Sequence, residues 1–308
     1  MSTAVYSHIA CLEHDPGQYH PESPARLSAV LDALNVERFS ALAWREAPMI
    51  DPKVIELAHP AAYVDRVLGA IPPQGRGALD RETLVSPGSR EAALRAVGAA
   101  VAAVDAVMAG ELTNAFCAVR PPGHHAEPQR AMGFCLFNNV AIGAFHARKA
   151  HGVRRVAVVD FDVHHGNGTQ AMFERDEELF YASSHEYPLY PGTGGAHERG
   201  VGNIVNVPLR AGSGSREFRA AYERVILPAL DAFKPDILLI SAGFDAHRDD
   251  PLSTLQLVED DYAWVTRALV EVARRHCRVR IVSTLEGGYD LPALAASAVA
   301  HVQELMAA

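Results

Sequence analysis

The segment VAVVDFDVHHGNG at 156–168 places the strongest constraint on how this chain folds. Its apolar run predicts a buried strand, and Asp160, Asp162 and His164 follow at alternate positions. Alternate residues of a strand share a face, so these three side chains can point the same way as the strand ends. Two carboxylates and an imidazole at a buried strand end require a neutralising cation. The segment therefore predicts a divalent metal site, with a solvated surface turn as the alternative.

Three further apolar runs that are predicted to be strands also end in polar motifs. FCAV at 116–119 leads into RPPGHH, ILLIS at 237–241 leads into AGFDAH, and the run at 279–285 leads into EGGYD. In open parallel α/β sheets, ligands bind outside the carboxyl ends of the strands. We therefore expect the motifs to meet in one crevice. The residues that they bring there are His124, His125, Asp245, Gly287, Gly288 and Tyr289.

Helical patterns fill the intervals between the strands. In the helix expected over 86–110, Ser86 is a suitable cap, Pro87 suits the first turn and Gly110 can end it. Strands alternating with helices predict an α/β fold, a three-layer sandwich with a central parallel sheet flanked by helices. The Gly-, Pro- and Tyr-rich segment 186–202 is predicted to be a loop at the rim of the site. Further strands are expected at 179–182 and 204–207, and further helices at 138–150 (closed by Gly152), 215–233 (bent at Pro228), 258–276 and 291–306.

Composition restricts the classes of protein that the chain can belong to. The 308 residues show no linker or repeat, so a single domain over 1–308 is favoured, and 49% hydrophobic residues suffice for a large core. A net charge of −9 argues against a nucleic-acid partner. The N-terminus has no signal-peptide pattern and no apolar run is long enough for a membrane span, so a cytoplasmic protein without a membrane partner is expected. The cysteines form no CxxC pair and are expected to be reduced thiols: Cys11, Cys117, Cys135 and Cys277.

Seven motifs together resemble one known family. They are HPESPAR (20–26), RPPGHHA (120–126), GFCLFNN (133–139), DFDVHHGNGTQ (160–170), YPGTG (190–194), SAGFDAHRDDPL (241–252) and EGGYDL (286–291). The set is similar to the zinc-dependent histone deacetylase family, and most similar to its class II and bacterial histone deacetylase-like amidohydrolase branch, which includes acetylpolyamine amidohydrolases. The resemblance spans about residues 14 to 290. It implies an arginase-like α/β fold and a zinc-dependent deacylase.

The resemblance also implies the metal ligands. One Zn²⁺ per chain would be held by Asp162, His164 and Asp245. Three protein ligands leave an open position for water and for the substrate carbonyl, as catalytic zinc requires. A mixed oxygen and nitrogen site would also accept Fe²⁺ or Co²⁺.

By the same resemblance, five residues form the catalytic machinery. Asp160 would bind His124 and Asn167 would bind His125, which gives the two histidines different electrostatic settings. His125 would take a proton from the metal-activated water and return it to the leaving amine. His124 would orient the water, and Tyr289 would donate its hydroxyl to the carbonyl oxygen.

The family pattern extends to a tunnel and a second ion. It implies that the carbonyl of Gly133 accepts the scissile amide N–H, that Phe134 and Tyr190 form aromatic walls, and that Leu252 lies at the rim. Gly287 and Gly288 are assigned to substrate binding, and Arg26 to a position behind the metal ligands. A structural K⁺ is implied at Asp160, Asp162, His164, Ser183 and Ser184, largely through backbone oxygens.

Several alternatives remain open from the sequence. A non-catalytic acyl-lysine reader is disfavoured because the catalytic tyrosine is present. A binuclear manganese hydrolase of the arginase or agmatinase type resembles a D-x-H-x-D pattern, but Gly166 and His247 stand where carboxylates would be expected. The substrate can be an acylated lysine peptide or a small acetylated amine such as an acetylpolyamine. The oligomeric state is not predicted.

Overall fold

The computed structural model describes residues 2–308 and contains a central parallel sheet. Eight strands lie in the order β2-β1-β5-β10-β9-β6-β7-β8, and every neighbouring pair is parallel. The predicted α/β sandwich is thereby confirmed. A separate antiparallel pair is formed by β3 (Gly77–Ala78) and β4 (Leu84–Val85). The strands of the main sheet are β1 (Thr3–Ser7), β2 (Ala43–Glu46), β5 (Asn114–Cys117), β6 (Val156–Asp160), β7 (Leu179–Glu186), β8 (Ile204–Leu209), β9 (Ile237–Ala242) and β10 (Ile281–Leu285).

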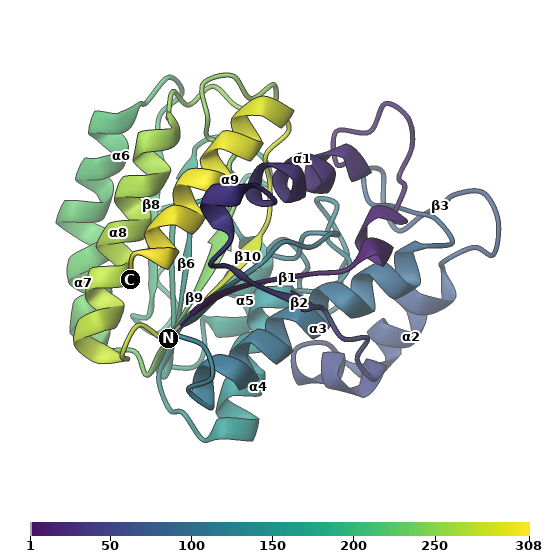
Figure 1. Cartoon of the computed structure of the whole chain (residues 1–308), viewed down its shortest axis with the longest axis horizontal. Helices are drawn as coiled ribbons and strands as arrows, with labels where there is room; N and C mark the ends of the chain where they lie inside the picture. The colour runs from purple at the N-terminus through teal and green to yellow at the C-terminus, as the bar shows by residue number, and fades with distance from the viewer. Residues whose placement is uncertain (1) are drawn as a thin grey trace.

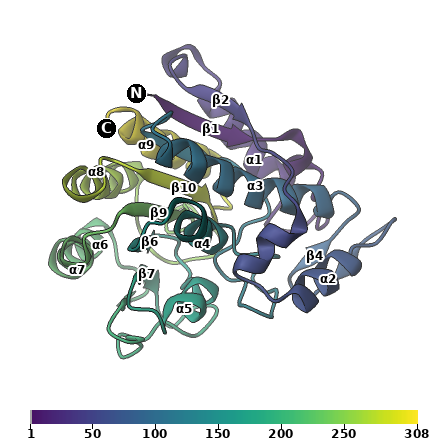
Figure 2. The same cartoon turned by 90° about the horizontal axis from the view of Figure 1, so that it is seen from below.

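Helices cover both faces of this sheet (Figures 1 and 2). The helices α1, α9, α8 and α7 lie on one face, and α3, α4 and α5 lie on the other. The central strands are therefore buried on both sides, which explains their continuous apolar runs. The helices are α1 (Pro24–Leu34), α2 (Ala61–Gly69), α3 (Ser89–Met108), α4 (Asn139–His151), α5 (Asn167–Phe173), α6 (Ser215–Ala221), α7 (Leu227–Phe233), α8 (Glu259–His276) and α9 (Leu291–Met306), with short 3₁₀ helices at Ile9–Leu12, Glu37–Phe39 and Pro52–Leu57.

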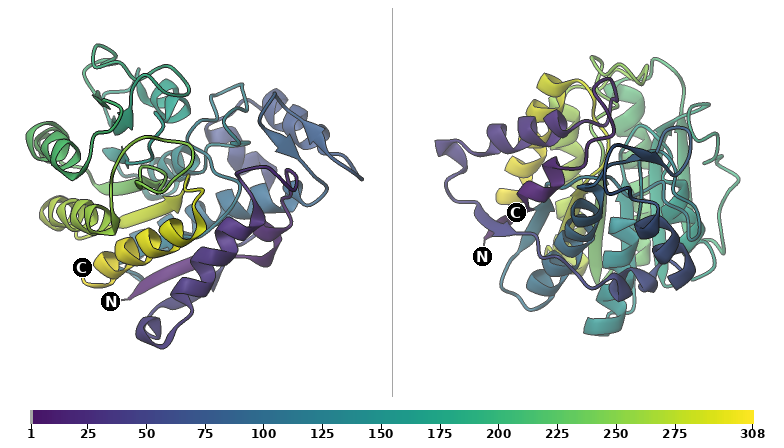
Figure 3. Two further views of the ribbon diagram at one scale, coloured as in Figure 1. Left: turned by 90° about the horizontal axis from the view of Figure 1, so that it is seen from above. Right: turned by 90° about the vertical axis from the view of Figure 1, so that its right-hand side faces the viewer.

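The two ends of the chain lie side by side (Figure 3). Thr3 in β1 donates its hydroxyl to the carbonyl of Leu305 in α9 at 3.1 Å. The N-terminal strand pairs with β5, so residues from both ends of the chain enter one core. The sequence patterns did not predict β1 or β2. Within residues 2–308, no helix combines the length and the apolar composition that a membrane span needs.

Two predicted helices differ from expectation at particular residues. The long helix α3 begins at Ser89, so Ser86 is not its cap and Pro87 lies before its first turn. Instead, the Ser86 N–H donates to the Ser89 hydroxyl at 2.8 Å, and the Ser86 hydroxyl donates to the Glu13 carbonyl. The helix expected over 215–233 carries a π-helical turn, Tyr222–Ile226, just before Pro228. A proline lacks the N–H that a regular helix needs, which accounts for this irregular turn.

Candidate active site

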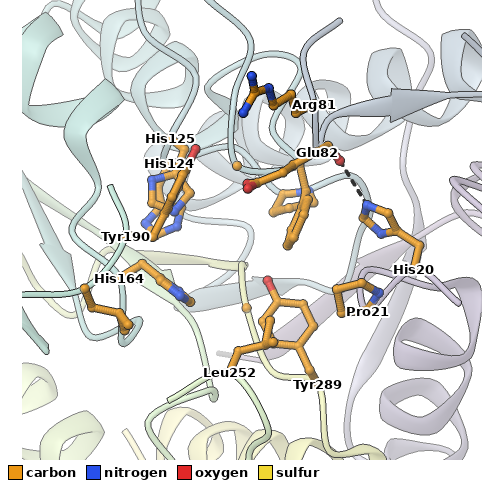
Figure 4. Close-up of a pocket in the computed structure, with 15 residues that line it drawn as sticks. His20, Pro21, Arg81, Glu82, His124, His125, His164, Tyr190, Leu252 and Tyr289 are labelled. Carbon is orange, nitrogen blue, oxygen red and sulfur yellow. Dashed lines mark hydrogen bonds between the residues drawn. The ribbon is translucent and has the colours of Figure 1, made fainter. Parts of the chain in front are cut away.

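Four neighbouring strands deliver the polar motifs to one edge of the sheet. The central order β5-β10-β9-β6 places the carboxyl ends of these strands next to one another. The chain leaves β5 toward His124 and His125, β6 toward Asp162, β9 toward Asp245, and β10 toward Tyr289. The expected crevice is present, because residues from the loops after β5, β6 and β10 line one cavity (Figure 4).

Asp162, His164 and Asp245 converge at this edge. Each offers one ligand atom, and these atoms all lie within 4.8 Å of one another. His164 Nδ1 donates to Asp162 Oδ1 at 3.0 Å and lies 3.1 Å from Asp245 Oδ2. Both aspartates are fully buried. Burial acts to lower the pKa of His164, but its hydrogen bonds to the two carboxylates raise it to about 10.

This donor set fits a divalent cation. One imidazole nitrogen and two carboxylates are ordinary ligands for zinc and for neighbouring transition metals. A proton on His164 offsets part of the negative charge of the two carboxylates. A divalent ion would displace this proton when it binds. Backbone N–H groups hold the remaining oxygens: Val163 donates to Asp245 Oδ1 at 2.9 Å, and Gly287 donates to Asp162 Oδ2 at 2.8 Å.

Gly287 has no room for a side chain. A Cβ atom there would lie 2.0 Å from Asp245 Oδ2 and 2.6 Å from Asp162 Oδ2. Glycine therefore lets the backbone N–H approach the carboxylates. The next residue, Gly288, has φ +124°, a backbone conformation that favours glycine. Gly287 lines the cavity, whereas Gly288 lies behind it, and its carbonyl accepts a hydrogen bond from Arg26.

The two adjacent histidines make the two hydrogen bonds expected from the sequence. His124 Nδ1 lies 2.9 Å from Asp160 Oδ2, and His125 Nδ1 lies 2.8 Å from Asn167 Oδ1. Burial acts to lower the pKa of His124, but the charges of Asp162 and Asp160 raise it well above its usual value. Burial and the neighbouring His124 hold the pKa of His125 well below its usual value. The surroundings therefore favour the cationic form of His124 and the neutral form of His125.

A buried glutamate, to which the sequence patterns assign no role, supports this pair. Glu286 Oε2 accepts the N–H of Gly123 at 2.7 Å and the N–H of His124 at 3.1 Å. Burial raises the pKa of Glu286 to about 7, against the lowering effect of His124. Glu286 belongs to the EGGYDL motif, so the signal was present, but its hydrogen bonds join it to residues 163 and 162 positions away.

Tyr289 points its hydroxyl toward the middle of the cavity (Figure 4). Arg26 lies over its ring at 4.8 Å and donates to the carbonyls of Glu286 and Gly288, both at 2.5 Å. Burial raises the pKa of Tyr289 well above its usual value, although Arg26 acts to lower it. Arg26 therefore contacts the loop that carries the tyrosine. The hydroxyl stays protonated and can donate a hydrogen bond.

Two acidic residues fix the surroundings of Tyr289 and were not assigned this role from the sequence. Asp250 Oδ2 accepts the N–H of Tyr289 at 2.7 Å, and its Oδ1 accepts the N–H of Leu252 at 3.0 Å. Glu22 is fully buried and pairs with Arg26 at 3.0 Å. It also binds the equally buried Arg120. Isolated charges could not remain at these depths without such partners.

The cavity has a volume of about 410 Å³, and nine of the residues predicted for the site line it. Gly133 has φ +56°, and a Cβ there would lie 2.4 Å from the ring of His125. Phe134 has φ +68°, a left-handed conformation that is uncommon for phenylalanine and typical of functional loops. The predicted residues that line the cavity are His124, His125, Gly133, Phe134, His164, Tyr190, Leu252, Gly287 and Tyr289, and the unpredicted ones are His20, Pro21, Arg81, Glu82, Pro122 and Leu189.

The rim of the cavity is mixed rather than purely apolar. Leu252 and Leu189 lie among the lining residues, as do the exposed Arg81 and Glu82 from the β3–β4 hairpin. His20 Nε2 contacts the Glu82 carbonyl at 2.9 Å and joins this hairpin to the segment before α1 (Figure 4). Leu252 therefore makes one side of the rim apolar, and Arg81 and Glu82 give the other side opposite charges (Figure 4).

The segment 186–202 contributes to the cavity as expected. Its Tyr190 packs edge-on against His125, with the ring centroids 5.1 Å apart. Glu198 holds the loop by accepting the N–H groups of Gly194 at 2.9 Å and Gly195 at 2.8 Å. The first residue of the segment, Glu186, still belongs to β7.

The residues assigned to K⁺ include two candidate metal ligands, Asp162 and His164, together with Asp160 at the end of β6 and two serines of β7. Asp160 in β6 stands opposite Ser183 in β7 in the strand register. The Ser183 hydroxyl contacts His185 Nδ1 at 2.9 Å, and the Ser184 hydroxyl contacts the Tyr222 hydroxyl at 3.4 Å. The serine hydroxyls already have partners, so a cation here would rely on backbone oxygens.

Comparison with known proteins places the chain in a family. The model of the histone deacetylase domain matches residues 20–305. The chain belongs to the histone deacetylase family, and the resemblance found in the sequence motifs is confirmed. Its class is accordingly that of a deacetylase-type hydrolase.

Individual relatives agree with this membership. A histone deacetylase-like amidohydrolase of Pseudomonas aeruginosa is 40% identical over 92% of this chain and 76% of its own length. A probable deacetylase of Archaeoglobus fulgidus is 39% identical over 94% of this chain and 82% of its own length. The crystal structure of the HDA15 HD domain superposes with a TM-score of 0.95 at 36% identity, covering 99% of this chain and 88% of that one.

Proposed function

We propose that the protein is a zinc-dependent amide hydrolase that removes acetyl or related acyl groups from lysine side chains. One observation carries this proposal: candidate metal ligands, two electrostatically different histidines and a tyrosine hydroxyl meet at one cavity.

We further propose that residues 1–308 act as one catalytic domain. The four cysteines, all buried and unbridged within residues 2–308, support a cytoplasmic location.

Asp162, His164 and Asp245 would hold the Zn²⁺, one ion per chain. Their atoms converge within 4.8 Å, and their backbone partners leave them oriented toward one another. A bound zinc ion supplies Lewis-acid polarisation of the amide carbonyl and makes water more acidic. Fe²⁺ and Co²⁺ bind the same kinds of ligand, so they would substitute for Zn²⁺ at this site.

His125 would act as general base and then as general acid. Its lowered pKa keeps the imidazole neutral, so that it can take a proton from the attacking water. The side-chain oxygen of Asn167 binds Nδ1 of His125 and so fixes the orientation of the imidazole ring. Nε2 of His125 is then left for the reaction. His124, held by Asp160, would keep a positive charge beside the water and stabilise the negative charge that develops. His125 would finally return the proton to the leaving amine.

Tyr289 and the cavity walls would position the acyl group. The Tyr289 hydroxyl would donate a hydrogen bond to the carbonyl oxygen as negative charge develops there. Phe134 and Tyr190 would flank the aliphatic chain, and the Gly133 carbonyl would accept the amide N–H. Gly133 O already accepts the Cys135 thiol at 3.3 Å, and a carbonyl has a second lone pair available.

We also propose the structural K⁺ at Asp160, Asp162, His164, Ser183 and Ser184. The support is the adjacency of β6 and β7 and the burial of negative charge at Asp160. Backbone carbonyls and carboxylates are suitable ligands for a hard cation. Such an ion would stabilise the strand ends that carry the zinc ligands.

The binuclear alternative fits this chain poorly. A Cβ at Gly166 would lie 2.3 Å from Asp160 Oδ2 and 2.6 Å from the Tyr181 hydroxyl, so a carboxylate cannot be accommodated there. His247 instead accepts the N–H of Asp249 on its Nδ1. Within residues 2–308, the metal-binding group at this edge contains only the three proposed ligands.

Replacement of Tyr289 by phenylalanine should reduce kcat strongly and leave folding intact. The change removes one hydroxyl and little volume, and the loss of one such hydrogen-bond donor costs about 10²–10³ in turnover. Zinc content and thermal stability should remain close to wild type. Steady-state kinetics on an acetyl-lysine peptide measures the effect. Tyr187→Phe, on an exposed residue of the neighbouring loop, is the matched control. A near-normal kcat for Tyr289→Phe would remove Tyr289 from the mechanism.

The substrate should be an acyl-lysine peptide rather than an acetylpolyamine. A polyamine carries further ammonium groups, and an enzyme specialised for it gains from unopposed carboxylates at the rim. Here Leu252 is apolar, and the Glu82 carboxylate is accompanied by Arg81. Asp250 is buried beneath Tyr289 and engaged with backbone N–H groups. We expect a higher kcat/KM for acetyl-lysine peptides than for N-acetylputrescine or N-acetylspermidine.

A substrate panel with two rim variants tests this choice. Leu252→Glu should shift the kcat/KM ratio toward the polyamines, and the neutral Leu252→Gln should not. Glu and Gln have nearly the same size, so the comparison isolates the charge. A wild-type preference for acetylpolyamines of tenfold or more, about 1.4 kcal/mol in transition-state binding, would identify the enzyme as an acetylpolyamine amidohydrolase instead.

A further inference from the structure

A second cluster of metal-ligand type lies outside the active site. Asp105 in α3 and His146 and His151 in α4 bring their ligand atoms within 4.8 Å of one another. Both imidazole Nε2 atoms lie 2.7 Å from the same carboxylate oxygen, Asp105 Oδ1. The two rings are 5.9 Å apart and nearly perpendicular, at 79°, so they approach the oxygen from two sides.

The positions of these side chains are set by regular structure. The imidazoles of His146 and His151 are only 18% and 24% exposed, because α3 and α4 pack closely together. His151 is the last residue of α4, and Gly152 ends the helix in a left-handed conformation with φ +65°. The cluster is therefore held by the packing of two helices and by a fixed helix end.

The cluster lies at the opposite edge of the sheet from the active site. Asp105 is in the last turn of α3, and His151 ends α4. The strands that follow, β5 and β6, begin after short connections, so the cluster is near the edge where strands start. The carbonyl groups at the ends of both helices carry partial negative charge, which favours a cation.

We propose that Asp105, His146 and His151 form a second site for a divalent transition-metal ion such as Zn²⁺, which clamps α3 to α4. Imidazole nitrogens and a carboxylate oxygen suit zinc, nickel and copper ions. Bonds of about 2.0–2.1 Å in a tetrahedral arrangement separate ligand atoms by about 3.3 Å. The present 2.7 Å contacts need only a small outward shift of surface side chains to reach this spacing. Water would complete the coordination.

Equilibrium dialysis against Zn²⁺ with elemental analysis tests the proposal. Wild-type protein should bind two equivalents, and His146→Ala and His151→Ala should each bind one while keeping wild-type kcat. Asp162→Ala should also bind one, because it retains the α3–α4 site. In a binuclear active site, by contrast, this change would remove both ions. Asp105→Asn preserves the size of the side chain and should likewise bind one equivalent.

A matched control and a second readout complete the test. His276 Nε2 lies 2.9 Å from Asp231 Oδ1 as a surface pair without a second imidazole, so His276→Ala should still bind two equivalents. Added Zn²⁺ should raise the Tm of wild-type protein that already holds its active-site ion, and should not raise that of His146→Ala. A single equivalent in wild-type protein, or an unchanged count in both histidine variants, would overturn the proposal.

Discussion

Alanine in place of Asp162 or Asp245 is expected to abolish retention of the active-site zinc and deacylation together. Either change leaves the ion with one carboxylate and one imidazole, too few ligands for a tightly held catalytic metal. The fold should survive, because each change removes one of two buried carboxylates that repel each other. Elemental analysis of dialysed protein, kcat on an acetyl-lysine peptide and far-UV circular dichroism measure the three properties.

The control for this experiment is a carboxylate in the same loop that is not a ligand. Asp249 is largely exposed, with 61% of its side chain accessible, and Asp249→Ala should retain zinc and activity. Asp162→Asn keeps the size of the side chain and guards against a general loss of folding. Full occupancy of the active-site metal in Asp162→Ala, measured in a His146→Ala background, would contradict the ligand assignment.

Alanine at His125 should lower kcat by about 10²–10⁴, the usual contribution of a general acid–base group. In wild-type protein, falling pH protonates His125 and removes the base. Burial and the charge of His124 lower the pKa of His125, so this acidic limb should lie below the ordinary histidine range. The positive charge of a metal ion bound nearby would also lower the pKa of His125. In the His125→Ala variant, the pH–rate profile of the residual activity should lack this acidic limb.

The other histidine serves as the internal comparison. His124→Ala should also be impaired, but its residual activity should keep the acidic limb of wild type. Asn167→Ala removes the hydrogen bond to His125 Nδ1 and should reduce kcat with little change in KM. If His125→Ala keeps an unchanged acidic limb, the role of general base belongs to His124.

Local sequence patterns predicted the central part of the fold and a metal site after β6, whereas the family resemblance supplied the full set of proposed ligands. The buried strand β6 reads as a continuous apolar run because helices cover both of its faces. Asp162 and His164 follow it directly, so their placement depends only on where the strand ends. The placement of Asp245 after β9 predicted that it lies in the same crevice, because ligands gather at the carboxyl ends of parallel strands. Its role as a ligand was implied by the family resemblance.

The contacts that local patterns did not predict join distant segments of the chain. Arg26 contacts Gly288, 262 positions away, and Glu22 binds Arg120 across 98 positions. Neither pairing leaves a periodic signal in the sequence. Arg81 and Glu82 reach the rim only because a short hairpin folds over the cavity.

Helix starts and loop conformations were also beyond local reasoning. Ser86 has the composition of a helix cap, but its hydroxyl donates to Glu13 in a segment far along the chain, and α3 begins at Ser89. Phe134 adopts a left-handed conformation that its residue type disfavours. The surrounding loop imposes this conformation, and that loop is set by tertiary packing.

Zinc-dependent deacylation is tested most directly by a metal titration of activity. His146→Ala protein, which lacks the proposed second site, is stripped of metal with a chelator and reloaded with measured amounts of Zn²⁺. Hydrolysis of an acetyl-lysine peptide is followed at each point. We predict no activity in the stripped protein, a linear rise up to one equivalent of Zn²⁺ per chain, and a plateau beyond it. Full activity in the stripped protein, or a rise that continues to two equivalents, would contradict the mononuclear zinc mechanism.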